Sequence, residues 1–159
     1  MPTADSGAID ALNSLLTGSR DGAQNFRDAA ESVERPDIRD ALGVFANETA
    51  EHAVTFEAEI RRLGGDPDGG GKLGAKARRV LQNVKTAVSG RDDSATLSEV
   101  EKGLDQAEQN YALALRASLD AGSRALVERN WADIQRHHNQ VAAWLRQDPG
   151  RAQGAPAGR

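Results

Sequence analysis

The chain has 159 residues, of which 20 are lysine or arginine and 24 are aspartate or glutamate, so its formal net charge is -4 at pH 7. The absence of cysteine excludes disulfides, thiolate metal sites, iron–sulfur clusters and cysteine nucleophiles. Basic and acidic residues are interspersed, which disfavours nucleic-acid binding because neutralising phosphates requires a concentrated cationic face.

No apolar run approaches the length of a membrane-spanning helix, and the opening "MPTADSGAID" lacks the basic start and apolar middle of a signal peptide. A chain of this size buries enough apolar surface to fold as one domain. We therefore expect a single domain over residues 1–146, located in the cytoplasm, with no membrane and no nucleic-acid partner.

Apolar residues recur at intervals of three and four, and aromatic residues make up only 4% of the chain, which predicts an all-α protein. The first helix is expected from Ser6, its N-cap, to Glu34, where Pro36 ends it. The second begins near Asp37 and stops at "GGDPDGGG". Helices joined by so short a break pack as antiparallel neighbours.

A shorter amphipathic helix is expected over residues 72–90, and a fourth helix from "RDDS" to about Gly122. The fifth helix continues to Leu145, and residues 147–159 form a disordered tail because they carry no apolar anchor. If the short helix runs back along the bundle, the second hairpin starts where the first hairpin turns. The expected fold class is therefore an all-α, ferritin-like four-helix bundle of two antiparallel hairpins with a short crossover helix.

Five polar residues fall on or beside the apolar stripes of the expected helices, where burial would require a partner. His52 lies inside the stripe of the second helix, with Glu48 one turn earlier at its edge. Glu108 lies in the middle of the fourth stripe, with Glu101 two turns before it. His138 lies on the apolar face of the fifth helix. The estimated heights predict one polar layer of His52, Glu108 and His138.

Two neighbouring positions are expected to play no part in this layer. His137 projects to the flank of the fifth helix, near Trp144, and is expected to be half-exposed. The first helix offers no inward carboxylate, only Ser19 beside Ala23.

The stretches "DGAQNFRDAAESVERPDIRDALGVFANETAEHAVTFEAEIRRLGGDP", "VSGRDDSATLSEVEKGLDQAEQNYALAL" and "IQRHHNQVAAWL" resemble a bacterial four-helix-bundle family of unknown function in the ferritin-like superfamily. The resemblance extends from about Leu12 to Leu145. It implies a stress-related setting. For the di-iron proteins of that superfamily it also implies one glutamate from each of two helices and a Glu-x-x-His pair from each of the other two.

His52 and His138 stand where those pairs should be, but Thr49 and Gln135 occupy the positions three residues earlier. Because a dinuclear centre needs several carboxylates to neutralise two ions, the sequence does not predict an intact di-iron site. The leading interpretation is a non-catalytic interaction or structural protein that needs no cofactor, acting as a homodimer or with a protein partner.

Two alternatives remain open. One is a metal-binding protein or oxidoreductase that holds iron, manganese or zinc with the reduced set His52, Glu108, His138, Glu101 and Glu48. In a second register for such a site, Glu48 and His52 are four residues apart, as are Asp133 and His137, although Asp133 projects towards solvent. The other alternative is a bundle centre that binds a small apolar molecule, in space left by the alanines and Ser19 of the first helix.

Overall fold

A computed structural model describes residues 2–67 and 92–147 of the chain. These residues form four α-helices and no strand: α1 (Pro2–Ser32), α2 (Pro36–Arg62), α4 (Asp93–Ala114) and α5 (Ala121–Gln147). The predicted all-α four-helix bundle is therefore confirmed. The short helix expected over residues 72–90 lies outside the described residues, as do residues 148–159 of the tail expected over residues 147–159, whereas Gln147 is the last residue of α5.

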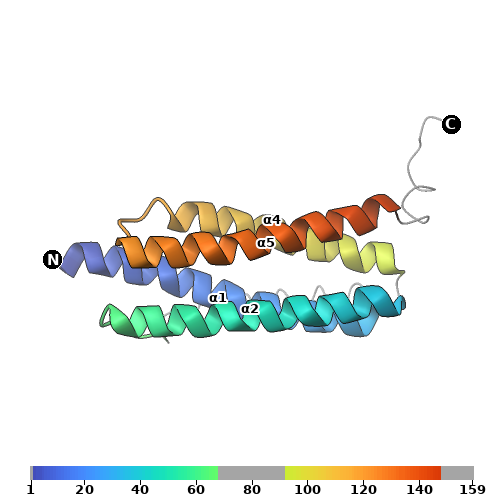
Figure 1. The fold of residues 1–159 in the computed structure, drawn as a ribbon, viewed down its shortest axis with the longest axis horizontal. Helices are drawn as coiled ribbons and strands as arrows, with labels where there is room; N and C mark the ends of the chain where they lie inside the picture. Colours follow the sequence, from blue (N-terminus) through green and yellow to red (C-terminus); the bar gives the residue numbers. More distant parts are fainter. Residues whose placement is uncertain (1, 68–91, 148–159) are drawn as a thin grey trace.

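The four helices follow an up-down-down-up order (Figure 1). Helix α2 ends at one end of the bundle and α4 begins at the other, so α2 and α4 run in the same direction. At one end, the backbone N–H groups of Glu34 and Arg35 donate to the carboxylate of Asp93, at 2.8 and 3.2 Å. At the other end, Arg62 forms a 2.8 Å ion pair with Asp120. The second hairpin thus begins where the first one turns, as predicted, which is the order of bundles with one long crossover connection.

The end of α2 is set by glycine. Gly64 has a φ of 84°, a conformation that L-residues with a side chain rarely adopt. The N–H of Gly65 donates to the carbonyl of Ile60 at 2.8 Å, and the N–H of Gly64 donates to Arg61 at 3.0 Å. These two bonds form a Schellman motif, which satisfies carbonyl groups left open at the helix end. The "LGG" sequence therefore stops α2 for a defined stereochemical reason.

The predicted end of the fourth helix is wrong. α4 ends at Ala114 rather than near Gly122, and a non-helical connection follows over residues 115–120. The carboxylate of Asp120 accepts a 2.8 Å bond from the N–H of Ser123, which caps the start of α5. Leu115 and Leu119 continue the apolar pattern because both pack against the core from within the connection, so periodicity alone could not show that the helix had ended.

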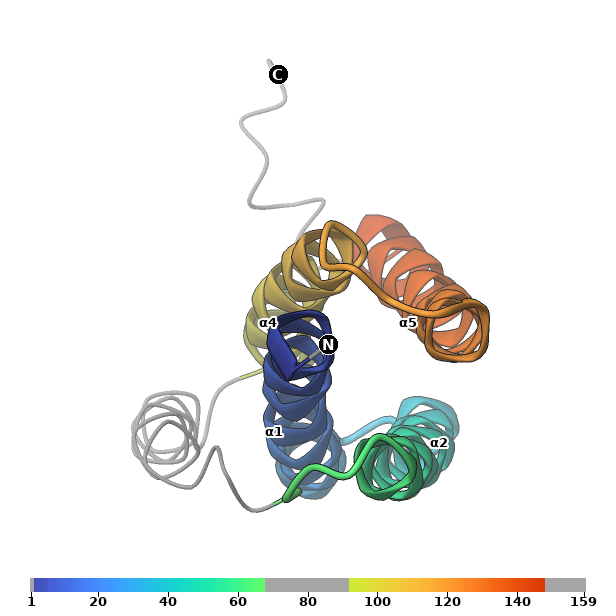
Figure 2. The same cartoon turned by 90° about the vertical axis from the view of Figure 1, so that its left-hand side faces the viewer.

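The core is built from all four helices, and its widest seam lies between α2 and α5. Figure 2, which views the bundle from one end, shows these two ribbons farther apart than the other neighbouring pairs. Aromatic rings fill the seam: Phe45 of α2 stacks on Trp144 of α5, with ring centroids 6.0 Å apart, and meets Phe26 of α1 edge to face at 5.6 Å. A wide seam of this kind has room for large polar side chains between the helices.

Candidate functional site

Two histidines and two carboxylates meet in the seam between α2 and α5. Glu48 and His52 are four residues apart on α2, and Asp133 and His137 are four apart on α5. Residues at this spacing share a helix face. Because the two helices run antiparallel (Figure 1), each carboxylate lies opposite the histidine of the other helix. We call these four residues, together with Arg136, the paired-histidine cluster.

The cluster is a continuous chain of hydrogen bonds and ion pairs with one histidine at each end. His52 Nε2 lies 2.9 Å from Asp133 Oδ2, and His137 Nε2 lies 2.6 Å from Glu48 Oε1. A single guanidinium nitrogen, Nη2 of Arg136, donates to Glu48 Oε1 at 3.2 Å and to Asp133 Oδ1 at 3.1 Å. The positive charge of the arginine therefore lies between the two carboxylates.

His137 is the most deeply buried member of the cluster. Its exposed fraction is 0%, and its ring stacks on Phe45 with centroids 4.2 Å apart and planes 23° apart. Phe26 meets the same imidazole edge to face at 5.5 Å. Burial lowers the pKa of His137, and the positive charge of Arg136 adds to this effect, although Glu48 opposes it. We infer a neutral imidazole at pH 7 that donates its Nε2 proton to Glu48.

Both carboxylates of the cluster are stabilised in their ionised form. Burial raises the pKa of Glu48, but the hydrogen bonds from His137 and Arg136 outweigh burial, so the net pKa is below the ordinary value. The pKa of Asp133 is lowered in the same way: His52 and Arg136 outweigh the effect of burial. The Nδ1 atoms of His52 and His137 are buried and have no hydrogen-bond partner within the part of the chain that the structure describes.

A second cluster lies between α4 and α5 around His138. Its Nδ1 is hydrogen-bonded to Glu108, and its Nε2 lies 3.2 Å from Asp105 and 3.9 Å from Glu101. The side chain of His138 is 24% exposed, so this cluster is at the edge of the bundle rather than at its centre. The carboxylates approach opposite nitrogens of one ring and so do not converge on one point.

The single predicted layer is therefore divided between two clusters. The structure brings Glu108 and Glu101 to His138, as the sequence suggested, but His52 is bonded to Asp133 and Glu48 to His137. One expectation about side-chain placement was wrong, because His137 is fully buried rather than half-exposed. The side chain of Asp133 is 38% exposed, in line with its expected position towards solvent, but its carboxylate also bonds the buried His52.

The reason for these differences is the width of the buried face of α5. This helix packs against α4 on one flank and across the wide seam against α2 on the other, so both His137 and His138 have protein neighbours. When the helix is projected onto one apolar stripe, His138 falls on the stripe and is predicted to be more buried than His137, which falls on its flank. The signal that identifies the paired-histidine cluster is instead the matching four-residue spacing of carboxylate and histidine on the two helices.

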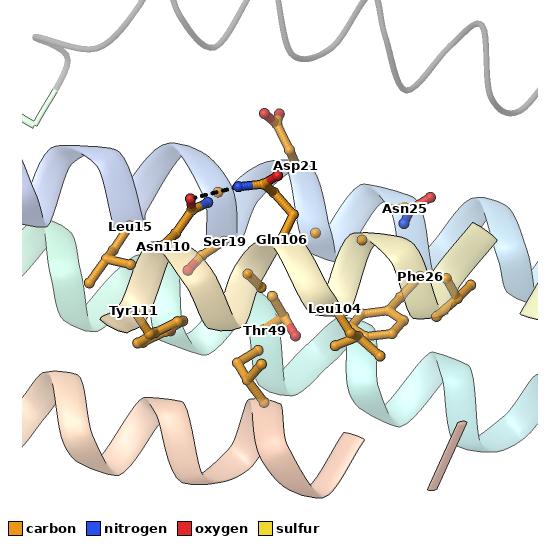
Figure 3. A pocket seen from close by; sticks show the side chains of 16 residues that line it. Leu15, Ser19, Asp21, Asn25, Phe26, Thr49, Leu104, Gln106, Asn110 and Tyr111 are labelled. Atoms are coloured by element: carbon orange, nitrogen blue, oxygen red, sulfur yellow. Dashed lines mark hydrogen bonds between the residues drawn. The ribbon is translucent and has the colours of Figure 1, made fainter. Parts of the chain in front are cut away.

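The first helix carries a buried carboxylate, but not an inward one. Asp21 is 9% exposed, close to Ser19, which is 5% exposed. In Figure 3 the carboxylate of Asp21 points away from the bundle centre, on the side opposite Thr49. It therefore does not supply the inward ligand that a dinuclear site would need from α1.

The residues present do not fit a di-iron centre. At the position where a carboxylate should precede His52, the hydroxyl of Thr49 donates to the carbonyl of Phe45 at 2.7 Å, and the other such position holds the exposed Gln135. Over residues 2–67 and 92–147, no three His, Cys, Asp or Glu side chains are placed so that they could hold a metal ion.

None of the helices in the described part of the chain is both long enough and apolar enough to cross a membrane. No curated protein matches the chain. A family model described as a domain of unknown function, DUF2383, matches residues 7–117, which include α2 and α4 and most of α1 but not α5. Because this match covers more than half of the 159 residues, the chain belongs to the DUF2383 family.

Proposed function

We propose that this protein is a non-catalytic helical bundle of ferritin-like ancestry that acts as a structural or interaction protein. The observation that carries the proposal is the position of Arg136, whose Nη2 atom bonds both Glu48 and Asp133. The guanidinium supplies the positive charge that a metal ion would otherwise provide between these carboxylates. The paired-histidine cluster is then an internal clamp that fixes α2 against α5, a role that polar core residues can take.

The up-down-down-up helix order supports the ferritin-like ancestry, since bundles with one long crossover share it. The loss of carboxylates at Thr49 and Gln135 and on the inner face of α1 explains why such a bundle would lack the dinuclear chemistry of that superfamily. The bacterial origin and the stress-related setting are parts of this proposal that rest on the sequence resemblance alone.

Metal content tests this proposal directly. Protein purified without an affinity tag should contain much less than one equivalent of iron, manganese or zinc when measured by elemental analysis. A stoichiometric metal that is lost in His52→Ala would contradict the clamp interpretation. His138→Ala is the matched comparison, because it removes a histidine of the other cluster from the same bundle.

Association with a second copy is tested by light scattering at two protein concentrations. A homodimer would have twice the mass of the 16.9 kDa chain. A strictly monomeric protein over the whole range would remove self-association from the proposal and leave a partner of another kind.

A second candidate function is binding of one divalent cation by the cluster around His138. The observation in its favour is that Glu101, Asp105 and Glu108 all approach one imidazole, which gives the cluster an excess of negative charge. Because these carboxylates lie at opposite nitrogens of the ring, a bound cation would require their side chains to turn towards one point. Imidazole and carboxylate ligands suit zinc, manganese or iron. Calorimetric titration of the unmodified protein with each ion should show binding at one site. The Glu108→Gln variant should show no such binding. If no ion binds to the unmodified protein, this candidate fails.

A further inference from the structure

A cavity of about 370 Å³ lies between α1 and α4 and extends to side chains of α2 and α5. Figure 3 shows its two sides. Gln106 and Asn110 lie on one side, where they are joined by a 3.1 Å hydrogen bond, while Thr49, Tyr111 and Leu104 lie on the other, towards α2 and α5. Cavities of this size hold small organic ligands of roughly ten to twenty heavy atoms.

Three helical glycines line the cavity: Gly18 and Gly22 on α1 and Gly103 on α4. A Cβ atom would meet Asn25 at 3.1 Å from Gly103 and Thr49 at 3.4 Å from Gly22, so the spare room lies at Gly18. A Cβ atom at Gly18 would meet only the amide nitrogen of Asn110, at 3.8 Å, which is ordinary van der Waals contact. Close packing therefore does not require glycine at this position. Glycine inside a helix costs about 0.5–1 kcal/mol relative to alanine, so the missing side chain leaves space without a compensating contact.

A buried hydrogen-bond donor belongs to the cavity wall. Tyr111 is 3% exposed, and its hydroxyl has no hydrogen-bond acceptor among the described residues, although the nearby Ser19 hydroxyl can donate to its oxygen. Burial raises the pKa of this phenol, and the nearby hydroxyl of Ser19 offsets only part of the effect. The phenol is thus a neutral O–H donor, and buried donors are normally satisfied. An acceptor atom on a molecule in the cavity would satisfy it.

The remaining wall defines the charge of that molecule. Leu15, Phe26, Leu104 and Ile134 present apolar surface to the cavity. Among the described residues that line the cavity there is no lysine, arginine or histidine, so an anionic occupant would lose its hydration without gaining a cationic partner. We infer that the cavity is a binding site for a neutral, mainly apolar small molecule that carries one hydrogen-bond acceptor, such as a carbonyl group, to which the Tyr111 hydroxyl donates.

Three probes with the same ring system separate the parts of this inference. 2-Acetylnaphthalene has the ring and a carbonyl acceptor, naphthalene lacks the acceptor, and 2-naphthoate is an anion. Calorimetry with the full chain should show saturable one-to-one binding of 2-acetylnaphthalene, weaker binding of naphthalene, and binding of 2-naphthoate at least tenfold weaker than that of the ketone. Absence of saturable binding of 2-acetylnaphthalene would overturn the inference.

Two variants test the location and the donor. Gly18→Leu fills the cavity and should abolish binding of all probes, whereas Gly43→Leu, at a helical glycine with nothing within 4 Å of a Cβ, should leave binding unchanged. Tyr111→Phe should weaken binding of the ketone about tenfold, which corresponds to about 1.4 kcal/mol from one hydrogen bond. The affinity for naphthalene should not change.

Unchanged binding in Gly18→Leu would show that the probes bind elsewhere and would overturn the inference. Circular dichroism shows whether each variant is folded. If Gly18→Leu does not fold, Ala107→Leu fills the same cavity from the facing helix and should also abolish binding.

Discussion

His137 shows how a single residue combines packing and charge. Its ring is fully buried and stacked on Phe45, while its Nε2 bonds the carboxylate of Glu48. A protonated imidazole would gain from Glu48 but would lose hydration and face Arg136. Burial decides the balance, so folding makes His137 harder to protonate.

This balance gives a pH dependence with a definite sign. The pKa of His137 is lower in the folded protein than its ordinary value of 6.5, so the unfolded chain takes up the proton first as the pH falls. The contribution of His137 to the free energy of unfolding is therefore complete above about pH 6.5 and declines below it. Denaturant unfolding measured between pH 8 and pH 5 should show this decline.

This decline should disappear in His137→Gln. The free energy of unfolding of the variant at pH 7 should also be lower by about 1–3 kcal/mol, as is usual when a buried hydrogen-bonded residue is replaced. His138→Gln is the matched control, because it leaves the bond between His137 and Glu48 intact. An unchanged pH profile in His137→Gln would contradict the assignment of this titration to His137.

At the scale of the helices, the sequence predicts which helices form and which of them pack together better than it predicts the residues at which they end. The stretch "GGDPDGGG" predicted the end of α2 correctly, because its first glycine, Gly64, adopts the positive φ that ends the helix. The end of α4 was missed because Leu115 and Leu119 keep helical spacing within the connection. The partners of His52 and Glu48 were missed because the separation of α2 and α5 is a tertiary property.

The Schellman motif at Gly64 makes a prediction about α2. Gly64→Ala forces an L-residue into the left-handed region and should destabilise the protein by about 1–2 kcal/mol. Gly43→Ala is the matched control: it lies within α2, its Cβ would meet nothing within 4 Å, and it should stabilise the protein by up to about 1 kcal/mol. Equal effects of the two substitutions on the melting temperature would contradict this account of the helix end.

At the scale of the whole molecule, the bundle is held by an apolar core and by polar links between its helices. The sequence was sufficient for the fold class and the crossover order, since apolar periodicity and short breaks determine both. The sequence was not sufficient to predict which polar side chains contact one another in the two histidine clusters. Whether a polar residue on a broad helix face meets one neighbour or another depends on interhelical spacing that a projection of single helices does not contain.

Acid unfolding should report the link between α2 and α5. Glu48 and Asp133 have pKa values below their ordinary values of 4.5 and 3.8. Their contribution to stability is therefore present above those ordinary values and is lost as the pH falls through the lower folded-state values. The double variant Glu48→Gln/Asp133→Asn should be less stable at pH 7 but lose less further stability between pH 5 and pH 2 than the unmodified protein. Equal losses in both proteins would show that other carboxylates govern acid unfolding.

The central claim, that the Arg136 guanidinium takes the place of a cation between Glu48 and Asp133, is tested most directly by calorimetric zinc titration of Arg136→Gln. No three of the four His, Asp and Glu side chains of the cluster are placed to hold a metal ion while Arg136 is present, but without the guanidinium the two carboxylates lose their positive partner, and zinc, which accepts imidazole and carboxylate ligands, could draw these side chains together. We predict that Arg136→Gln binds one zinc ion at least tenfold more tightly than the unmodified protein, and that adding His52→Ala removes this gain. Tighter zinc binding by the unmodified protein than by Arg136→Gln would contradict the claim.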